Sequence, residues 1–188
     1  MKDIVYFDLE TQRSFSDVGG SAHKEKMGVS VGVTYSTKLD EYRVFGEDEM
    51  DALVQQLTEA DLVVGFNHID FDYAVLQKYT ILQLEHSTAN LDLLVDIEKI
   101  LGHRVKLDSV AGSSLNLSKT GDGLDALKWW QEHKKTQSIE PLMKIAKYCC
   151  FDVKVTKAVH EYGAEHGHIK YPDKVTGEIK QIDVDWSL

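Results

Sequence analysis

The strand-like run Ile4-Val-Tyr-Phe7, which leads directly into Asp8-Leu-Glu10, is the feature that most constrains the fold. Consecutive apolar residues of this kind indicate a buried strand. Alternate residues of a strand share a face, so Asp8 and Glu10 should lie side by side. Burying two carboxylates is costly unless a cation or another partner neutralises them. The pair therefore points to a shared site, although two solvated acids at the start of a loop would fit the dipeptide equally well.

The length and the apolar content of the chain favour a single domain. With 188 residues, 43% of them hydrophobic, the chain can bury one good core but is short for two domains of usual size. We therefore expect one domain over residues 1–188, in which residues 168–188 form a C-terminal hairpin extension. Gly177 would lie in the turn of that hairpin.

Short apolar runs and few cysteines bear on where the protein works. Lys2 and Asp3 run straight into the first strand-like segment, and an apolar run such as Leu62–Phe66 is short. No signal peptide or membrane span fits this pattern. The two cysteines, Cys149 and Cys150, are adjacent in a helical segment and point in different directions, so we expect neither a disulfide nor a zinc site. A cytoplasmic setting without membrane attachment is expected.

Hydrophobic periodicity predicts an α/β fold with one main sheet. Alternating and apolar runs predict strands early in the chain, and helical spacing dominates the second half. The predicted strands are residues 3–8, 29–35, 41–45 and 61–65; the predicted helices are residues 47–59, 70–79, 91–101, 108–115, 124–134 and 139–166; residues 169–171 and 178–184 form the hairpin. Antiparallel strands crossed by helices and followed by a helical half indicate an α/β layer arrangement.

A second group of polar residues lies between a predicted strand and a predicted helix, in the segment Gly65-Phe-Asn67-His-Ile-Asp70-Phe71-Asp72. Such junctions often carry binding residues. Asp70 could instead cap the helix, and Asp72 could favour the positive end of its dipole. Taken alone, the segment fits this structural role better. Both acids remain candidates for a ligand.

A third group lies in the last predicted helix, where Tyr148 and Asp152 are four residues apart. This spacing places the phenol and the carboxylate on neighbouring positions of one helix face. Steps of about 100° per residue put both residues at the edge of an apolar sector of the helix. That sector comprises Leu142, Ile145, Cys149 and Val153, whereas Lys144, Lys147, Lys154 and Lys157 lie farther round on the other side. Asp152 should therefore lie at a rim. A tyrosine packed on the core beside a surface aspartate would show the same spacing.

Together the three groups resemble the motifs of the DEDD exonucleases, which belong to the ribonuclease H-like superfamily. Their first motif, D-x-E-T, corresponds to Asp8-Leu-Glu10-Thr11. Their second motif ends in an aromatic residue and an aspartate after an upstream asparagine, here Asn67, Phe71 and Asp72. The motifs occur in the family's order, from residue 8 to residue 152.

The third motif and two further segments refine the resemblance. Y-x-x-x-D, here Tyr148 and Asp152, is typical of the DEDDy subclass, whereas the other subclass has a histidine where this chain has Lys147. The segments Leu107–Ala111 and Gly121–Leu124 resemble YprB-like ribonuclease H-like domains and, more distantly, the proofreading domains of family-B DNA polymerases.

The resemblance implies both a fold and an activity. The fold would be ribonuclease H-like, with a central mixed sheet whose first three strands are antiparallel, and with flanking helices. The activity would be 3′-to-5′ exonuclease cleavage of DNA, expected to be single-stranded, that releases nucleoside 5′-monophosphates by a two-metal mechanism. Ligation by oxygen atoms alone favours Mg or Mn.

The motif positions also imply roles for the metal ligands. Asp8 would bridge two divalent cations, Glu10 and Asp152 would hold the cation that activates water, and Asp72 would support the second cation. Tyr148 would orient the attacking water, because a phenol with a pKa near 10 is mostly protonated at neutral pH.

Substrate contacts are implied in the first two motifs. The main chain near Leu9 and Thr11 would receive the terminal 3′ hydroxyl group, and Asn67 and Phe71 would contact the substrate from the second motif. None of these contacts follows from spacing alone.

The net charge of −10 argues against a protein that wraps nucleic acid with a basic surface. Bound cations would supply the positive charge that an acidic nuclease needs. Two alternatives stay open: an exoribonuclease with the same site, and a weakly active nucleic-acid-binding module that works with a helicase or polymerase. A globular domain with coincidental acids would require all three structural explanations to hold at once.

Overall fold

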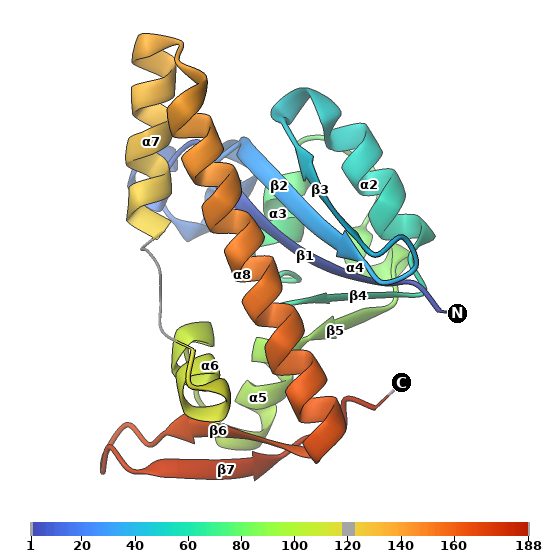
Figure 1. The fold of residues 1–188 in the computed structure, drawn as a ribbon. Helices are drawn as coiled ribbons and strands as arrows, with labels where there is room; N and C mark the ends of the chain where they lie inside the picture. Colours follow the sequence, from blue (N-terminus) through green and yellow to red (C-terminus); the bar gives the residue numbers. More distant parts are fainter. Residues whose placement is uncertain (1, 118–122, 188) are drawn as a thin grey trace.

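A five-stranded mixed sheet forms the centre of the computed structural model, which describes residues 2–117 and 123–187 (Figure 1). The strand order is β3-β2-β1-β4-β5. β1 pairs antiparallel with β2, and β2 antiparallel with β3, whereas β4 is parallel to both β1 and β5. The strands are β1 (Ile4–Thr11), β2 (Val29–Ser36), β3 (Glu41–Phe45), β4 (Leu62–Gly65) and β5 (Asn90–Asp92). The predicted α/β fold, with its antiparallel first three strands, is confirmed.

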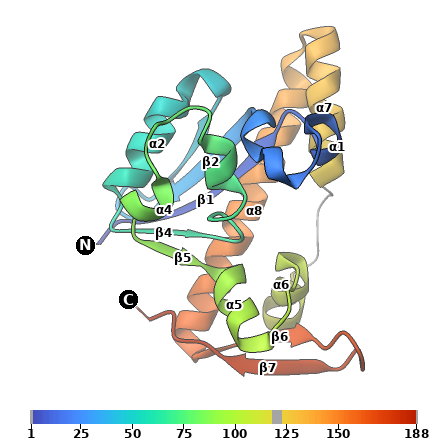
Figure 2. The same cartoon turned by 180° about the vertical axis from the view of Figure 1, so that it is seen from behind.

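Helices cover both faces of the sheet (Figures 1 and 2). The long helix α8 crosses one face, and α2 and α3 lie on the other. The helical segments are α1 (Phe15–Val18), η1 (Ser21–Lys26), η2 (Glu47–Glu49), α2 (Met50–Glu59), α3 (Asp72–Leu76), α4 (Leu84–Ser87), α5 (Leu93–Leu101), α6 (Leu107–Leu115), α7 (Gly123–Thr136) and α8 (Ile139–His166). None of the helices in the described part of the chain is both long and apolar enough to cross a membrane.

The alternation of β1 determines which side chains face α8. Val5, Phe7 and Leu9 are buried in the core on the α2 and α3 side of the sheet. Tyr6 is buried in the other core, together with Ile145 and other residues of α8. Because side chains alternate along a strand, the residues that follow Tyr6 at intervals of two also face α8. The two acids of the first motif are these residues.

The predicted helix over residues 91–101 is wrong at its start, because it begins with strand β5. The Asp92 side chain ends this strand and caps α5 by accepting hydrogen bonds from the N–H groups of Leu94 (3.1 Å) and Val95 (3.3 Å). β5 is only Asn90–Asp92, and its partner in the sheet is β4. So short a strand depends on that distant neighbour, which local periodicity does not reveal.

Several other boundaries also differ from the prediction. The helix expected over residues 47–59 begins with the 3₁₀ turn η2, and the helix expected over residues 70–79 is only α3. The short helices α1, η1 and α4 were not predicted, since they hold too few residues for a periodic pattern. Of the Gly121–Leu124 motif, Gly121 and Asp122 lie outside the described residues.

The predicted C-terminal hairpin is present as β6 (His168–Pro172) and β7 (Ile179–Asp183), with Ile169 opposite Ile182. Just after it, Trp186 is buried against α8. Its indole Nε1 donates to the Asp96 carboxylate of α5 at 2.8 Å, and its ring stacks on His160 at 6.2 Å between centroids. The end of the described chain therefore holds α5 and α8 together.

Gly163→Ala should destabilise the protein, because a Cβ atom there would lie 2.3 Å from Cε3 of Trp186. Overpacking of this kind costs about 1–3 kcal/mol, more than the gain in helix propensity from alanine. Thermal unfolding should show a melting temperature lower by roughly 2–4 °C per kcal/mol. On a Trp186→Ala background, the same substitution should have little effect or a stabilising one. An equal loss in both backgrounds would contradict the proposed clash.

Candidate active site

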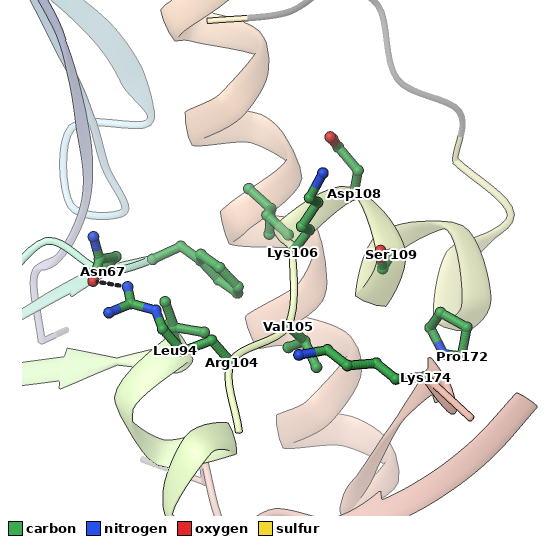
Figure 3. A pocket seen from close by; sticks show the side chains of 11 residues that line it. Asn67, Leu94, Arg104, Val105, Lys106, Asp108, Ser109, Pro172 and Lys174 are labelled. Carbon is green, nitrogen blue, oxygen red and sulfur yellow. Dashed lines mark hydrogen bonds between the residues drawn. The ribbon is translucent and has the colours of Figure 1, made fainter. Parts of the chain in front are cut away.

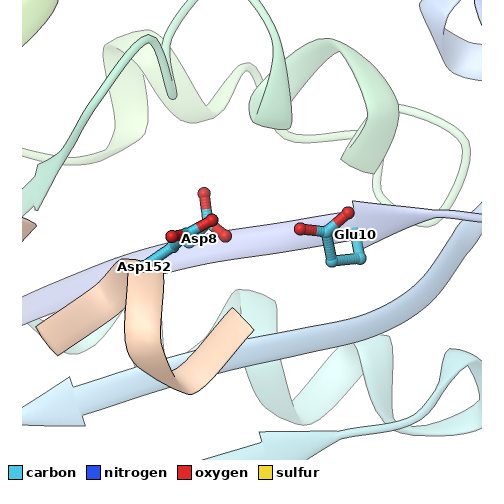
Figure 4. A group of neighbouring side chains, drawn as sticks. All are labelled: Asp8, Glu10 and Asp152. Atoms are coloured by element: carbon cyan, nitrogen blue, oxygen red, sulfur yellow. The ribbon is translucent and has the colours of Figure 1, made fainter. Parts of the chain in front are cut away.

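Three carboxylates converge where α8 crosses β1 (Figure 4). Asp8 and Glu10 come from β1, and Asp152 comes from α8. Each offers an oxygen atom, and these atoms all lie within 4.8 Å of one another. The two halves of this cluster are more than one hundred residues apart in the sequence, so packing of the helix on the strand brings them together.

The pKa values of the two β1 acids are raised well above their ordinary values. For Asp8 the main cause is burial of the carboxyl group, and the nearby charge of Asp152 adds to it. For Glu10 burial is again the first cause, followed by the charges of Asp8 and Asp152. Three like charges held in a partly buried site disfavour their own ionisation. The arrangement is electrostatically unstable unless positive charge enters it.

The cluster fits a hard divalent cation. All its donors are carboxylate oxygens, which are the ligands that Mg²⁺ and Mn²⁺ prefer. In the part of the chain that the structure describes, no ion pair to lysine, arginine or histidine involves Asp8 or Glu10. A bound cation would therefore supply a neutralising charge for these acids.

Asp72 lies next to this cluster, but its carboxylate is not one of the three converging groups. Its Oδ1 accepts a hydrogen bond from the Leu9 N–H at 3.1 Å, and burial followed by the charge of Asp8 raises its pKa well above the ordinary value. Asp70, by contrast, is exposed and pairs with Lys24 at 2.8 Å. Of the two acids in the second motif, the structure thus places Asp72 beside the end of β1.

Tyr148 lies one helical turn before Asp152 on α8. Burial is the main cause that raises the pKa of its phenol, followed by the charge of Asp152 and that of Glu10, and by a hydrogen bond with Asp152. The phenol therefore stays protonated across the physiological range. Its ring packs edge-on against Trp129, with 6.4 Å between centroids. This packing limits the positions that the hydroxyl group can take.

The predicted main-chain contacts near Leu9 and Thr11 lie on either side of Glu10. Leu9 is buried and its N–H already donates to Asp72. The Thr11 hydroxyl donates to the main-chain oxygen of Arg13 at 2.9 Å. A terminal hydroxyl group bound at Leu9 would therefore compete with Asp72 for the same N–H.

Asn67 and Phe71 lie on the loop that follows β4. Asn67 has a left-handed main chain with φ of 72°, and its side-chain oxygen accepts a hydrogen bond from Arg104. The Phe71 ring packs edge-on against Phe15, with 5.8 Å between centroids. Neither side chain is among the converging carboxylates. Asn67 thus contacts the segment between α5 and α6 through Arg104, and Phe71 contacts α1 through Phe15.

Asp92 supports the second motif and was not predicted to do so. Its buried carboxylate accepts hydrogen bonds from the N–H groups of Asn67 at 2.8 Å and Ile69 at 3.0 Å, in addition to capping α5. The buried His68 ring lies 3.5 Å from the same carboxylate. An aspartate just before Leu93-Leu94 is a cap signal, but the helix predicted through it concealed the signal.

Cys149 contacts the first acid directly. Its thiol lies 3.4 Å from both the main-chain oxygen and Oδ2 of Asp8. Burial and the charge of Asp8 raise the pKa of the thiol well above its ordinary value, so it stays protonated and donates. The hydrogen bond from the thiol lowers the pKa of Asp8 and so opposes part of the rise caused by burial and by Asp152. It also restrains the carboxylate. The sequence shows this cysteine only as a member of the apolar face of a helix.

Comparison with known proteins identifies a family and shows similarity to solved structures. A family model described as RNase_H superfamily matches residues 5–163. No curated protein sequence matches the chain. Among solved structures, the family B DNA polymerase from the hyperthermophilic archaeon Pyrobaculum calidifontis is similar with a TM-score of 0.64 and 17% identity, over 87% of this chain and 24% of that one. The chain thus spans about a quarter of the polymerase, and at this identity the likeness concerns the fold.

Asp8→Asn should stabilise the metal-free protein, because the amide removes a charge that burial and Asp152 disfavour. The folded state of the wild type holds protons that the unfolded state releases, so its metal-free stability falls as pH rises through the raised pKa values. In EDTA, the melting temperature of the variant should exceed that of the wild type by roughly 2–4 °C per kcal/mol of relieved repulsion, most clearly at alkaline pH.

Mg²⁺ or Mn²⁺ should reverse that order, since a ligand stabilises the form that binds it. The wild type should gain melting temperature on addition of either ion, and Asp8→Asn should gain much less. Asp70→Asn, which changes an exposed acid of the same type, is the matched control. Equal metal responses in the wild type and Asp8→Asn would argue against a cation at this cluster.

Proposed function

We propose that this chain, which belongs to the RNase H superfamily, is a metal-dependent 3′-to-5′ exonuclease of the DEDDy type. The observation that carries the proposal is the convergence of Asp8, Glu10 and Asp152 within 4.8 Å of one another. Superfamily membership supports nuclease chemistry in general. The DEDDy type and the 3′-to-5′ polarity rest on the three sequence motifs.

Four acids would hold the cations in this proposal. Asp8 would contact both ions, Glu10 and Asp152 one of them, and Asp72 the other. Two divalent cations would activate water, neutralise the phosphate oxygens and stabilise the leaving oxygen. The hydrogen bond from the Leu9 N–H to Oδ1 holds the Asp72 carboxylate beside the end of β1.

Tyr148 would position the attacking water. Because neighbouring acids and burial raise the pKa of its phenol, it is a poor proton acceptor. The hydroxyl group can still hold a water molecule by a hydrogen bond while Asp152 orients it. Correct placement of a nucleophile by such contacts lowers the entropic part of the barrier.

The substrate in this proposal is the 3′ end of a single DNA strand, cleaved to nucleoside 5′-monophosphates. The main chain around Leu9 and Thr11 would receive the terminal hydroxyl group, and Asn67 and Phe71 would contact the last nucleotides. Asn67 and Phe71 are partly exposed, which fits such contacts. A polymerase or helicase would be the class of protein partner.

Asp8→Ala and Asp152→Ala should each abolish metal-dependent shortening of an end-labelled oligonucleotide. The rate of cleavage should fall by more than about 100-fold. Mutation of residues that only hydrogen-bond to a metal ligand already lowers metal affinity or activity by about 10- to 100-fold, and a ligand itself contributes more. The substrates are single-stranded DNA, duplex DNA and RNA, each labelled at either end, with Mg²⁺ or Mn²⁺. Product ladders from each label report polarity, and the three substrates report preference.

The control for this assay is Asp70→Ala, which should retain activity because Asp70 is exposed and pairs with Lys24. Circular dichroism should show that all variants remain folded. Activity retained in both Asp8→Ala and Asp152→Ala would exclude the proposed site.

Tyr148→Phe should lower kcat by roughly 100-fold, the order expected when a nucleophile loses its placement. Metal binding should change little, as measured by the rise in melting temperature on addition of the metal ion. The pH profile should keep its shape across neutral pH, because the phenol does not titrate there. Tyr162→Phe, on the same helix, is the matched control. A wild-type rate for Tyr148→Phe would count against the positioning role.

A further inference from the structure

A pocket of about 710 Å³ opens at the edge of the sheet, next to the end of β4 (Figure 3). Its walls come from the loop after β4, from α5, from the start of α6 and from the β6–β7 hairpin. We propose that this pocket binds the internucleotide phosphates of a single strand on the 5′ side of the bond that is cut. This inference rests on the proposed exonuclease function.

The pocket begins beside the carboxylate cluster. β1 and β4 are parallel, with Tyr6 opposite Val64. Two residues farther along each chain come Asp8, in the cluster, and Phe66, in the wall of the pocket. The carboxyl ends of parallel strands lie at the same edge of a sheet, and ligands of open α/β sheets bind there. A strand whose 3′ end reaches Asp8 can therefore continue into the pocket.

The pocket concentrates positive charge on an acidic chain. Among the described residues, Arg104, Lys106 and Lys174 line it together with one acid, Asp108, whereas the whole chain has a net charge of −10. The three cationic residues are exposed, and Lys174 reaches the pocket from the hairpin, far from the other two in sequence (Figure 3). Contacts from lysine and arginine to phosphate provide most of the affinity of nucleic-acid binding. Such a cluster attracts a polyanion more strongly than the neutral and acidic surface around it does.

Arg104 also connects the pocket to the second motif. Its guanidinium group donates to the side-chain oxygen of Asn67 (Figure 3). This contact orients the Asn67 side chain so that its oxygen faces Arg104 and its amide nitrogen is directed elsewhere, where it can donate to a ligand. Arg104 is thus a positioning residue for Asn67 as well as a source of charge. One strand could contact both groups in succession.

The size and the lining of the pocket fit a single strand better than a duplex. Its volume of about 710 Å³ lies within the range of small-molecule sites, which suits one or two nucleotides. Its apolar lining can cover sugars and bases while the cations contact phosphates. The apolar residues in the wall are Phe66, Leu94, Val105, Leu107 and Pro172.

The test compares two double variants that remove the same charge. Lys106→Ala/Lys174→Ala changes the pocket, and Lys2→Ala/Lys38→Ala changes two exposed lysines near the opposite end of β1. Binding of a fluorescein-labelled oligothymidylate is measured by anisotropy in Ca²⁺, at several salt concentrations. All proteins carry Asp152→Asn so that the probe is not cleaved.

The pocket variant should bind about 10-fold more weakly than the parent protein. In a plot of log Kd against the logarithm of the salt concentration, its slope should be lower by about 1.4, which is about 0.7 for each lost phosphate contact to a single strand. The control variant should keep the parent slope. A second measurement uses proteins in which Asp152 is restored, and compares kcat/KM for the oligothymidylate with kcat/KM for thymidine 5′-monophosphate p-nitrophenyl ester. The ester has no nucleotide on the 5′ side. The ratio of the two values should be about 10-fold lower in the pocket variant than in the wild type.

Equal affinities and slopes for the two double variants would overturn the pocket assignment, even if the protein degrades DNA. A selective loss of binding in the pocket variant would support the assignment, even if no metal-dependent cleavage were found; the proposed exonuclease function alone would then fail. Circular dichroism of both variants confirms that the fold is unchanged.

Discussion

The repulsion among three carboxylates at the crossing of α8 and β1 is the constraint on which the rest of the structure depends. Besides burial, the charge of Asp152 raises the pKa of both Asp8 and Glu10, and the charge of Asp8 raises that of Glu10, so ionisation of all three acids is disfavoured. The apolar packing of α8 on the sheet, through residues such as Ile145 and Val153, must overcome this repulsion. A shift of one residue along β1 would turn the acids into the opposite core. The register of one strand and the docking of one helix therefore decide whether the site exists.

The molecule compensates for this cost outside the cluster. The buried Asp92 carboxylate holds both the loop after β4 and the start of α5, and Trp186 joins α5 to α8 through Asp96. Cys149 provides a neutral donor to Asp8 without adding charge. The residues that hold the site in place are thus different from the residues that would bind cations. Unfavourable interactions such as the repulsion among these acids are common at functional sites.

The distribution of charge explains how an acidic chain can meet a polyanion. The net charge of −10 would repel nucleic acid if it were spread evenly. Instead, the acids of the cluster would be neutralised by cations, and the pocket beside them gathers Arg104, Lys106 and Lys174. Local charge at the edge of the sheet, and not the total, determines what can bind there.

Local patterns in the sequence determined the alternation of β1, the long helix that carries Tyr148 and Asp152, and the presence of the first three strands. Each depends on neighbouring residues, whose spacing can be read directly. Tertiary structure alone decided that β5 is a strand, that Asp72 and not Asp70 lies beside β1, and that Cys149 donates to Asp8. It also decided that Lys106, which precedes α6, and Lys174 of the hairpin share one pocket. These features join segments that are distant along the chain, and no periodicity within a segment records which partner it will meet in space.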